Sequence, residues 1–371
     1  MIKSLKLPFA LSLLAAAVPL LAPHRAAAQD ERGGAVFAMT NAASNNQINA
    51  YNRLEDGSLQ FAAAFSTGGN GSGGTVDPLH SQGSLTLSAD HRLLFAVNAG
   101  SGTVSSFAVS GATLSLVDTV STGGSLPTSV TQVRDLIYVL NAGGNGSVSG
   151  FHSFPNGHLL PIPNSTHNLS GSATAPTDVV LSPNGQFLIV IESATNKIDV
   201  FHVFPNGTLS NPEVNDSGGS TPFAAVFAPG GALIVGNASN TISSYQVDWN
   251  GSLHIVSNAL PTDGQATCWD VIGQFGRSVY TSNAGSSTLS GFNIGRNGEL
   301  TPIGDAVVGQ NPTGSTNIDI AASYDGRYLY TLNAAAGTIG MFSVQDDGSL
   351  VSLGQQDGLS ASAGVNGIAA Y

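Results

Sequence analysis

Short hydrophobic runs alternate along this chain with loops of Gly, Asn, Asp, Ser and Pro, and one version of this pattern recurs seven times. Each unit has a hydrophobic run, a loop that opens with a polar residue, a second run that carries an aromatic residue, and a turn. The first polar loop residues are Asn41, Asn98, Asn141, Glu192, Asn237, Asn283 and Asn333. They are 43 to 57 residues apart, the length of one four-stranded propeller blade. The pattern therefore predicts an all-β, seven-bladed β-propeller.

The fourth unit shows the predicted strands of one blade most clearly. Residues 177–181, 187–191 and 197–203 are rich in β-branched and aromatic residues, and Leu209 begins a fourth strand after a Pro-Asn-Gly turn. Runs of this kind between Gly, Asn, Pro and Asp are strand and turn signals. Hardly any stretch keeps a 3.6-residue period, so helices are not expected.

The two ends of the repeat region complement each other. Residues 35–39 read as the second strand of a blade with no first strand before it, and residues 367–371 read as a first strand with nothing after it. We expect the C-terminal strand to join the first blade and close the ring, which leaves fewer exposed strand edges. Residues 29–371 then form one propeller domain.

The first 28 residues have the composition of a signal peptide. Lys3 and Lys6 precede an apolar run over residues 7–21, and residues 26–28 are all Ala. This order of basic, apolar and small residues is typical of a cleaved leader. A membrane anchor is the weaker alternative because prolines interrupt a run too short to span comfortably. We expect a secreted or periplasmic protein.

Charge and cysteine content exclude several functions. The chain has 11 basic and 23 acidic residues and a formal net charge of −12, so binding to nucleic acid or to an anionic membrane is disfavoured. Cys268 is the only cysteine, which excludes an internal disulfide and a paired-thiol zinc site. No two His stand at metal-ligand spacing on one element. We therefore expect no metal and no cofactor, and a monomer that acts on a small molecule.

Propeller topology brings the candidate site residues to one face. The loops between the second and third strands, and the connections between blades, lie at the channel mouth where propellers usually bind ligands. Glu192 stands where six blades have Asn, so it is a candidate general acid or base. The alternative is that Glu192 faces solvent or pairs with Lys197. His80 lies in the long Gly-rich connection before residue 84, and the alternative there is a solvated His.

A second group of residues is predicted to bind the substrate at the same mouth. Asp178, Asp270 and Asp319 occupy similar places early in three inner strands. They either form a carboxylate ring across the channel or cap backbone amides. Cys268 reads as a buried structural thiol beside Trp269. The predicted substrate-binding residues are Gln82, Asp178, Trp269, Asp319 and Asn98.

Two segments show the blade pattern of a known family: Leu-Leu-Phe-Ala-Val-Asn-Ala-Gly at residues 93–100 and Tyr-Asp-Gly-Arg-Tyr-Leu-Tyr at residues 324–330. With them the whole mature chain resembles the seven-bladed propeller lactonases, which include 6-phosphogluconolactonases and fungal carboxymuconate lactonising enzymes. The resemblance implies a lactone site in which His80 and Glu192 match the family's His and Glu by type and position.

The positions of the arginines differ from those in that family. All those in the repeats map to the opposite face, which leaves Lys197 as the only expected cation at the mouth. Phosphorylated sugars and tricarboxylates need several fixed cations, so a neutral or weakly charged lactone is expected, with Glu192, His80 and Lys197 as catalytic residues. The Asn-Ala-Gly phrases also resemble surface-layer propellers, and a non-catalytic binding or scaffold propeller is the alternative.

Overall fold

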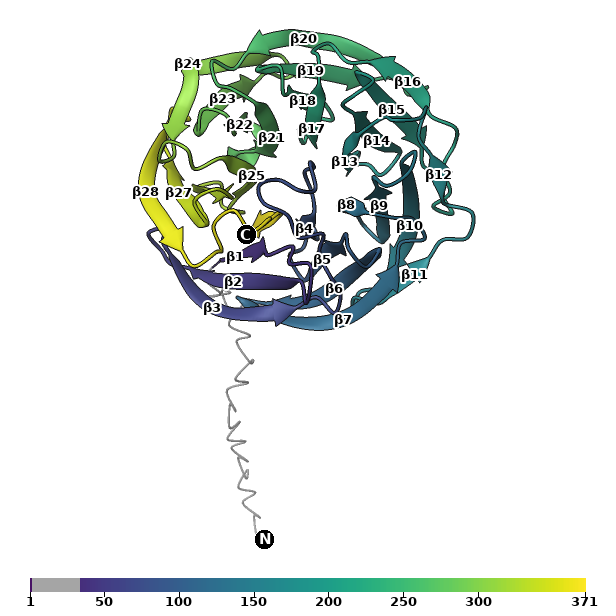
Figure 1. Cartoon of the computed structure of the whole chain (residues 1–371), viewed down its shortest axis with the longest axis horizontal. Helices are drawn as coiled ribbons and strands as arrows, with labels where there is room; N and C mark the ends of the chain where they lie inside the picture. The colour runs from purple at the N-terminus through teal and green to yellow at the C-terminus, as the bar shows by residue number, and fades with distance from the viewer. Residues whose placement is uncertain (2–33) are drawn as a thin grey trace. The chain divides into compact units, whose positions relative to one another are not determined.

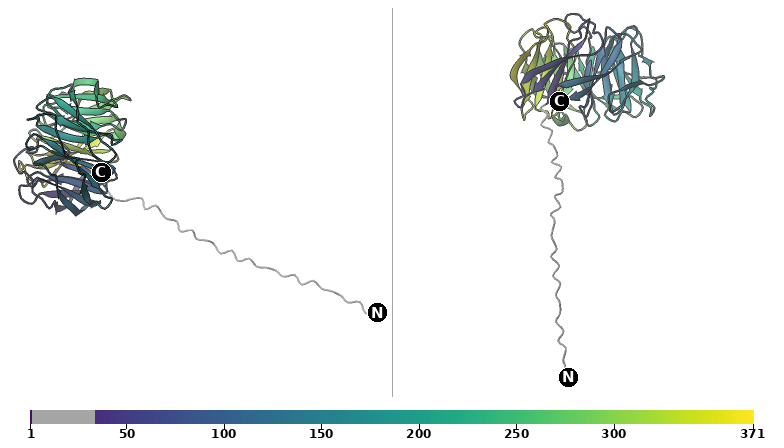
Figure 2. Two further views of the ribbon diagram at one scale, coloured as in Figure 1. Left: turned by 90° about the vertical axis from the view of Figure 1, so that its right-hand side faces the viewer. Right: turned by 90° about the horizontal axis from the view of Figure 1, so that it is seen from below.

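The computed structural model describes Met1 and residues 34–371. The predicted signal peptide, apart from Met1, lies outside the described residues. Seven antiparallel sheets stand around a central channel (Figure 1), and in six of them the strands run outward from it in chain order, whereas the first sheet has the C-terminal strand innermost. In the side views of Figure 2 the strands cross between the two faces of the ring. The predicted seven-bladed fold is confirmed.

The strands are grouped by their distance from the channel. The innermost strands, from blade 1 to blade 7, are β29 (Ile368–Ala370), β4 (Leu85–Leu87), β8 (Pro127–Val133), β13 (Pro176–Leu181), β17 (Pro222–Phe227), β21 (Thr267–Ile272) and β25 (Asn317–Ala322). The second strands are β1 (Ala35–Met39), β5 (Leu93–Asn98), β9 (Leu136–Asn141), β14 (Phe187–Glu192), β18 (Leu233–Asn237), β22 (Ser278–Asn283) and β26 (Tyr328–Asn333).

The outer half of each blade follows the same order. The third strands are β2 (Gln47–Arg53), β6 (Thr103–Ser110), β10 (Ser147–Ser153), β15 (Lys197–His202), β19 (Thr241–Val247), β23 (Thr288–Ile294) and β27 (Thr338–Val344). The outermost strands are β3 (Leu59–Ser66), β7 (Thr113–Ser121), β11 (Leu159–Pro161) with β12 (His167–Asn168), β16 (Glu213–Asp216), β20 (Leu253–Pro261), β24 (Leu300–Gln310) and β28 (Leu350–Asp357). A single 3₁₀ turn, η1 (Gln274–Gly276), follows β21 in the part of the chain that the structure describes.

Two outer strands differ from the sequence prediction. In blade 3 the outer strand is split, and both β11 and β12 pair with β10. In blade 4 the outer strand begins at Glu213, and Leu209 makes only an isolated bridge to Val203. Pro163 and Pro212 lie in the interrupted stretches, and a proline has no N–H to donate to a strand ladder.

The second strands form the core of each blade. Strands β1, β5, β14, β22 and β26 are buried along their whole length. They are continuous hydrophobic or small-residue runs because neighbouring blades cover both of their faces. The third-strand aromatics Tyr51, Phe107, Phe151, Phe201, Tyr245, Phe292 and Phe342 are at most 1% exposed. They fill the spaces between blades, and this packing fixes the ring.

The C-terminal strand closes the ring as expected. Strand β29 pairs with β1, with Phe37 opposite Ala369. The N–H of Met39 donates to the carbonyl of Gly367 at 3.0 Å, and the N–H of Tyr371 donates to the carbonyl of Ala35 at 3.0 Å. The first blade therefore takes its inner strand from the other end of the chain.

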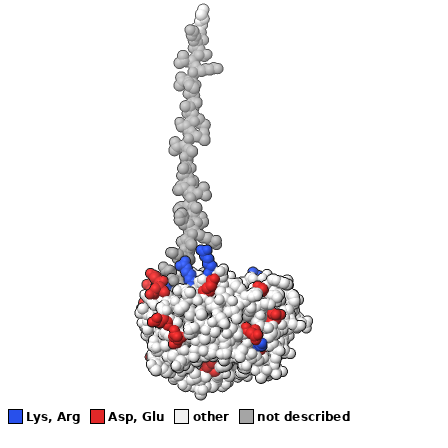
Figure 3. Space-filling view, turned by 90° about the horizontal axis from the view of Figure 1, so that it is seen from above, with Lys and Arg blue, Asp and Glu red and all other residues white. Residues whose placement is uncertain are grey.

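The two faces of the ring carry different loops. The mouth face carries the loops between second and third strands and the connections between blades. The turn face carries the turns between first and second strands and between third and fourth strands. Seen from the side, the surface of the ring is mostly uncharged, with scattered acidic and basic side chains (Figure 3).

Candidate functional site

The channel is covered at the mouth face by the connection between β3 and β4, residues 67–84, which we call the mouth loop. In Figure 1 it is the dark segment that leads into β4 and reaches the centre of the ring. Glycines allow its close approach to the blades: a Cβ at Gly71 would lie 2.2 Å from the backbone of Asn41, and one at Gly69 would lie 2.5 Å from the side chain of Asn98. Such contacts exclude any larger residue at either position.

Hydrogen bonds tie the mouth loop to blades 3, 4 and 6 and to the segment before the closing strand of blade 1. The Ser81 hydroxyl donates to the Thr128 carbonyl in blade 3 at 2.8 Å, and the Gln82 N–H donates to the Thr177 carbonyl in blade 4 at 3.0 Å. From blade 6, the Trp269 indole N–H donates to the Ser81 carbonyl at 3.0 Å, and the Asp270 N–H donates to Gln82 Oε1 at 2.8 Å. Before blade 1, Asn366 Nδ2 donates to Asp77 Oδ1 at 3.1 Å. The loop therefore plugs the mouth. Of the predicted substrate-binding residues, Gln82 is part of the plug and Trp269 contacts it.

His80 lies on the mouth loop, and part of its side chain is exposed. Its ring makes an edge-to-face contact with Phe223, with centroids 4.9 Å apart, and Phe223 contacts Trp269 at the same distance. Burial of the rest of the ring lowers the pKa of His80 from its ordinary value. The imidazole is therefore neutral at pH 7 and able to accept a proton.

Asp77 is a further titratable group beside His80, which the sequence analysis did not identify. Its Oδ1 accepts the backbone N–H of His80 at 3.0 Å and the side-chain amide of Asn366 at 3.1 Å. Burial, followed by the nearby charge of Asp319, raises the pKa of Asp77 to about 7. An Asp three residues before a His in a Gly-rich connection was the available signal, but an Asp in a turn usually bonds its own backbone.

Two of the three inner-strand aspartates, Asp178 and Asp319, cap backbone amides of neighbouring blades. Asp178 accepts the Ser129 hydroxyl at 3.0 Å and the N–H of Ala225 at 2.9 Å. Asp319 accepts the N–H of Ile368 at 3.0 Å, which joins blade 7 to the closing strand. Both side chains are buried, and burial raises their pKa values to about 8 for Asp178 and about 7 for Asp319. Of the two expected roles, the structure supports capping for Asp178 and Asp319.

Cys268 follows the expectation for a structural thiol. It is buried at the start of β21, and burial raises the pKa of its thiol. A protonated thiol is a poor nucleophile.

Glu192 lies inside blade 4, and the expected alternatives of a solvent-facing or Lys197-paired carboxylate are both wrong. Its side chain is fully buried. It accepts the N–H of Ser170 at 3.2 Å, the Ser170 hydroxyl at 2.9 and 3.0 Å, and the Thr195 hydroxyl at 2.7 Å. Lys197 pairs instead with Asp216 on the outer strand β16. The hydroxyl and amide donors come from the blade connection and from the loop after β14, contacts that repeat spacing does not reveal.

A second buried carboxyl group, Asp199, accompanies Glu192. The N–H of Ser170 also donates to Asp199 Oδ2 at 2.9 Å. Asp199 is fully buried, and burial, followed by the charge of Glu192, raises its pKa to about 7. The two carboxyl groups therefore lie close together in an enclosed site, where like charges disfavour the ionised form of Asp199.

Asn98 is structural and does not face a ligand. It donates to the hydroxyls of Thr103 at 3.1 Å and Ser105 at 2.8 Å on the next strand, and it accepts the Thr67 hydroxyl at 2.6 Å. Its side chain is fully buried. In blades 3 and 6 the repeated Asn likewise donates to a Ser side chain of the following strand.

The channel below the mouth loop contains a cavity of about 270 Å³. Gln82, Asp270 and Asp319 line its end at the mouth loop, and Leu87 and Ile272 line it farther along the inner strands. Neither this cavity nor the three described cavities outside the channel is lined by His80, Glu192 or Lys197. The structure does not bring the three predicted catalytic residues into one cavity.

Two further properties concern the described residues alone. None of their helices has the length and apolarity required to cross a bilayer. They contain no group of three or more His, Cys, Asp or Glu side chains arranged to hold a metal ion.

Comparison with known proteins supports the family resemblance. Residues 145–270 match the family described as lactonase, 7-bladed β-propeller. A provisionally assigned 6-phosphogluconolactonase from Bacteroides uniformis has a similar structure, with a TM-score of 0.71, 18% identity, and coverage of 91% of this chain and 99% of that one. The periplasmic gluconolactonase PpgL of Pseudomonas aeruginosa superimposes with a TM-score of 0.68 and 19% identity over 89% of this chain and 98% of that one. None of the curated proteins matches the chain by sequence. The resemblance to the propeller lactonases is confirmed, and at this identity the structural neighbours establish the fold.

Proposed function

We propose that this protein is an exported lactone hydrolase that acts on a neutral or weakly charged lactone at the mouth face. The observation that carries the proposal is the hydrogen bond from the backbone N–H of His80 to Asp77 Oδ1 at 3.0 Å, which holds two titratable residues together on the mouth loop. Burial raises the pKa of Asp77 and lowers that of His80. A neutral base beside a partly protonated acid is the arrangement that acid–base catalysis near pH 7 requires. The match of residues 145–270 to the lactonase family supports the reaction class.

In the proposed reaction His80 removes a proton from a water molecule as its oxygen attacks the lactone carbonyl. The protonated Asp77 carboxyl donates a hydrogen bond to the developing oxyanion. The ring C–O bond then breaks, and the leaving oxygen takes the proton from His80. The product is one open-chain hydroxy acid, and no other reactant besides water is consumed.

The charge around the mouth loop favours an uncharged substrate. In the described chain, no hydrogen bond or ion pair of the mouth loop involves Lys or Arg. The nearest predicted cation, Lys197, is engaged by Asp216. A phosphate or tricarboxylate would leave its charges without partners at such a site.

Glu192 and Lys197 take no direct part in this proposed reaction, although the sequence predicted both as catalytic residues. Glu192 reaches substrate only if the connection around Ser170 moves away, because Ser170 occupies both of its carboxylate oxygens. The Glu192→Gln variant therefore tests whether the enclosed carboxylate takes part.

The test is a panel of simple γ- and δ-lactones assayed with the purified protein. The wild-type protein should open at least one lactone faster than buffer, and His80→Asn should remove most of the gain without changing the melting temperature. We expect a bell-shaped pH profile: the rate rises as His80 loses its proton below pH 6.5 and falls as Asp77 ionises near pH 7. Asp77→Asn should flatten the alkaline limb. Equal rates for wild type and His80→Asn would remove His80 from the mechanism.

A non-catalytic binding or scaffold propeller is the second candidate, and the plugged mouth favours it. The mouth loop bonds to blades around the ring and leaves no described cavity at His80. If no lactone in the panel is opened by the wild-type protein while the fold is intact, the scaffold function is the better explanation.

Export is part of the proposal and has its own test. We expect the protein recovered from the periplasm or medium of a producing bacterium to begin at Gln29, after the three alanines. Recovery of a chain that still begins at Met1, in the cell interior, would contradict export.

A further inference from the structure

A groove on the turn face, opposite the mouth, has the largest volume of the described cavities. It lies among blades 2, 3 and 4 and encloses about 660 Å³, against 220 to 340 Å³ for the others. Small-molecule sites in proteins typically have volumes of about 300–1,000 Å³, mostly apolar walls and a few polar groups. We call this cavity the turn-face groove.

The walls of the turn-face groove are mainly apolar. Leu93, Val133, Phe154 and Pro155 contribute to them. Phe154 is 46% exposed, although a large aromatic ring gains free energy when it leaves water. A bound apolar group would cover it.

The equivalent turn in blade 4 provides an internal comparison. It has the same Phe-Pro-Asn-Gly sequence, and Phe204 is also 46% exposed. Phe204 lines none of the described cavities. The tetrapeptide by itself therefore does not create the groove.

The polar groups of the turn-face groove leave a cation without a counterion. Arg134 makes no ion pair with a described residue, and its backbone has φ 57°, a left-handed conformation that is uncommon outside glycine. The Arg92 side chain is 82% exposed, and its nearest carboxylate, Asp90, is 4.0 Å away. Two guanidinium groups at the rim of an apolar groove are suited to an anionic ligand.

The carboxylates of the same groove already have partners. Asp90 accepts the Ser88 hydroxyl at 2.7 Å and the N–H of Arg92 at 3.2 Å. Asp135 bonds to the imidazole of His152 at 3.0 Å. Both carboxylates therefore have hydrogen-bond partners within the chain, whereas Arg134 has no ion pair with a described residue.

We infer that the turn-face groove binds a small amphipathic carboxylate, with its apolar part against Phe154, Pro155 and Leu93 and its carboxylate at Arg134 and Arg92. This inference is independent of the proposed lactone hydrolysis, because the groove is on the opposite face from His80. A ligand there needs no catalytic group. Its recognition depends on both parts: burial of the apolar part supplies affinity, and the guanidinium groups select a carboxylate over its neutral analogue.

The test uses two probes of the same shape, 4-phenylbutyrate and 4-phenylbutyramide, titrated by calorimetry at pH 7.5 and low salt. The wild-type protein should bind the carboxylate about tenfold more tightly than the amide, which corresponds to one charge-assisted contact. Arg134→Asn should remove this preference, because Asn tolerates the left-handed conformation but carries no charge. Phe154→Ser should weaken the binding of both probes.

Matched controls come from the same face. Arg277 and Arg296 border a smaller cavity of about 220 Å³ with glycine-rich walls, and Arg277→Gln or Arg296→Gln should leave binding unchanged. Phe204→Ser should likewise have no effect. Absence of saturable binding by the wild type, or equal losses in the Arg134 and Arg277 variants, would overturn the inference. Melting curves confirm that each variant is folded.

Discussion

At the scale of single residues, blade 4 has the same strand arrangement as the other blades but has two carboxyl groups where others have an amide and a hydroxyl. In blades 2 and 6 the loop Asn donates to a Ser on the next strand at 2.8 Å. Blade 4 has Glu192 and Asp199 at the corresponding positions. An amide and a hydroxyl satisfy each other without charge, whereas two carboxylates need a shared proton or they repel. One blade of the ring therefore contains a proton-dependent contact.

This substitution predicts a pH dependence of stability. The pKa of Asp199 is raised from 3.8 to about 7 in the folded protein, so its stabilising contribution is complete below pH 3.8 and is lost as the pH rises through about 7. The double variant Glu192→Asn/Asp199→Ser should lose less stability than the wild type between pH 5 and pH 8.

Urea unfolding at the two pH values measures the difference. The wild type is the reference because Asp77, Asp178, Asp270 and Asp319, whose pKa values are also raised, remain in both proteins. The Lys197–Asp216 pair at the strand edge is unchanged as well. Parallel pH dependences in the two proteins would show that the carboxyl pair does not exchange a proton in this range.

At the scale of elements, the mouth loop closes one end of the channel. It replaces what would be an ordinary connection between blades, and the inner strand that follows it, β4, has only three residues. Gln82 bonds to Asp270 across the channel and so holds the loop in the mouth. Any ligand at His80 therefore meets a surface formed by this loop, while the channel cavity lies beneath it.

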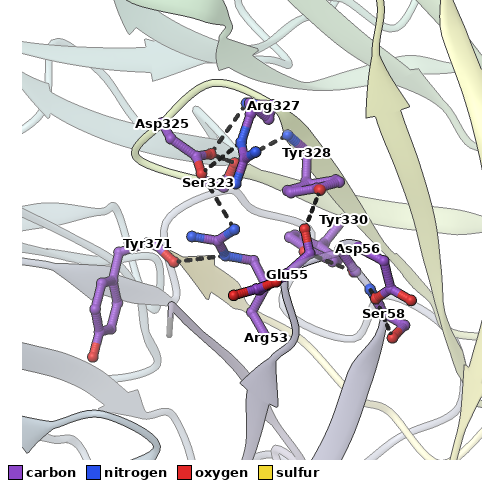
Figure 4. A network of polar contacts seen from close by, with 11 residues as sticks. Arg53, Glu55, Asp56, Ser58, Ser323, Asp325, Arg327, Tyr328, Tyr330 and Tyr371 are labelled. Carbon is purple, nitrogen blue, oxygen red and sulfur yellow. Dashed lines mark hydrogen bonds and ion pairs between the residues drawn. The ribbon is translucent and has the colours of Figure 1, made fainter. Parts of the chain in front are cut away.

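At the scale of the whole molecule, a polar seam reinforces the closure of the ring. Arg53 in blade 1 donates to the carbonyl of Tyr371 at 3.4 Å and pairs with Asp325 of blade 7 at 3.3 Å. Its guanidinium also lies 5.4 Å from the centre of the Tyr328 ring. Tyr328 and Tyr330 donate their hydroxyl protons to carbonyls of the first blade's turn at 2.6 and 2.9 Å (Figure 4). Blades 1 and 7 are joined by side chains as well as by β29.

Removal of the closing strand should open this seam. A chain that ends at Ser362 lacks β29 and exposes the edge of β1, and exposed edges promote aggregation. We expect a melting temperature lower by at least about 5 °C and poor solubility. A chain that begins at Asp30 and keeps the C-terminus is the control and should behave like the mature protein. Equal melting temperatures for the two chains would mean that the first blade is completed in another way.

The number of blades, their strand order and the closure of the ring could all be read from the amino-acid sequence. Each depends on a local pattern: a hydrophobic run buried by its neighbours, an aromatic on the third strand, and a Gly turn repeated at blade spacing. The outer strands of blades 3 and 4 were less predictable. A proline ends a strand ladder only where its missing N–H would have bonded to a partner strand, and the sequence does not show where that partner lies.

The candidate site depended on long-range packing that no repeat reveals. His80 and Trp269 lie at the mouth, but the Gly-rich connection that holds His80 also closes the channel, because its backbone and side chains bond to distant blades. The sequence identified Glu192 because it replaces the Asn of the other blades. The environment of its side chain is set by Ser170 and Asp199, which approach it from another connection and another strand. A single-residue change signals unusual chemistry, and only the folded ring determines whether that chemistry faces a ligand or a neighbouring side chain.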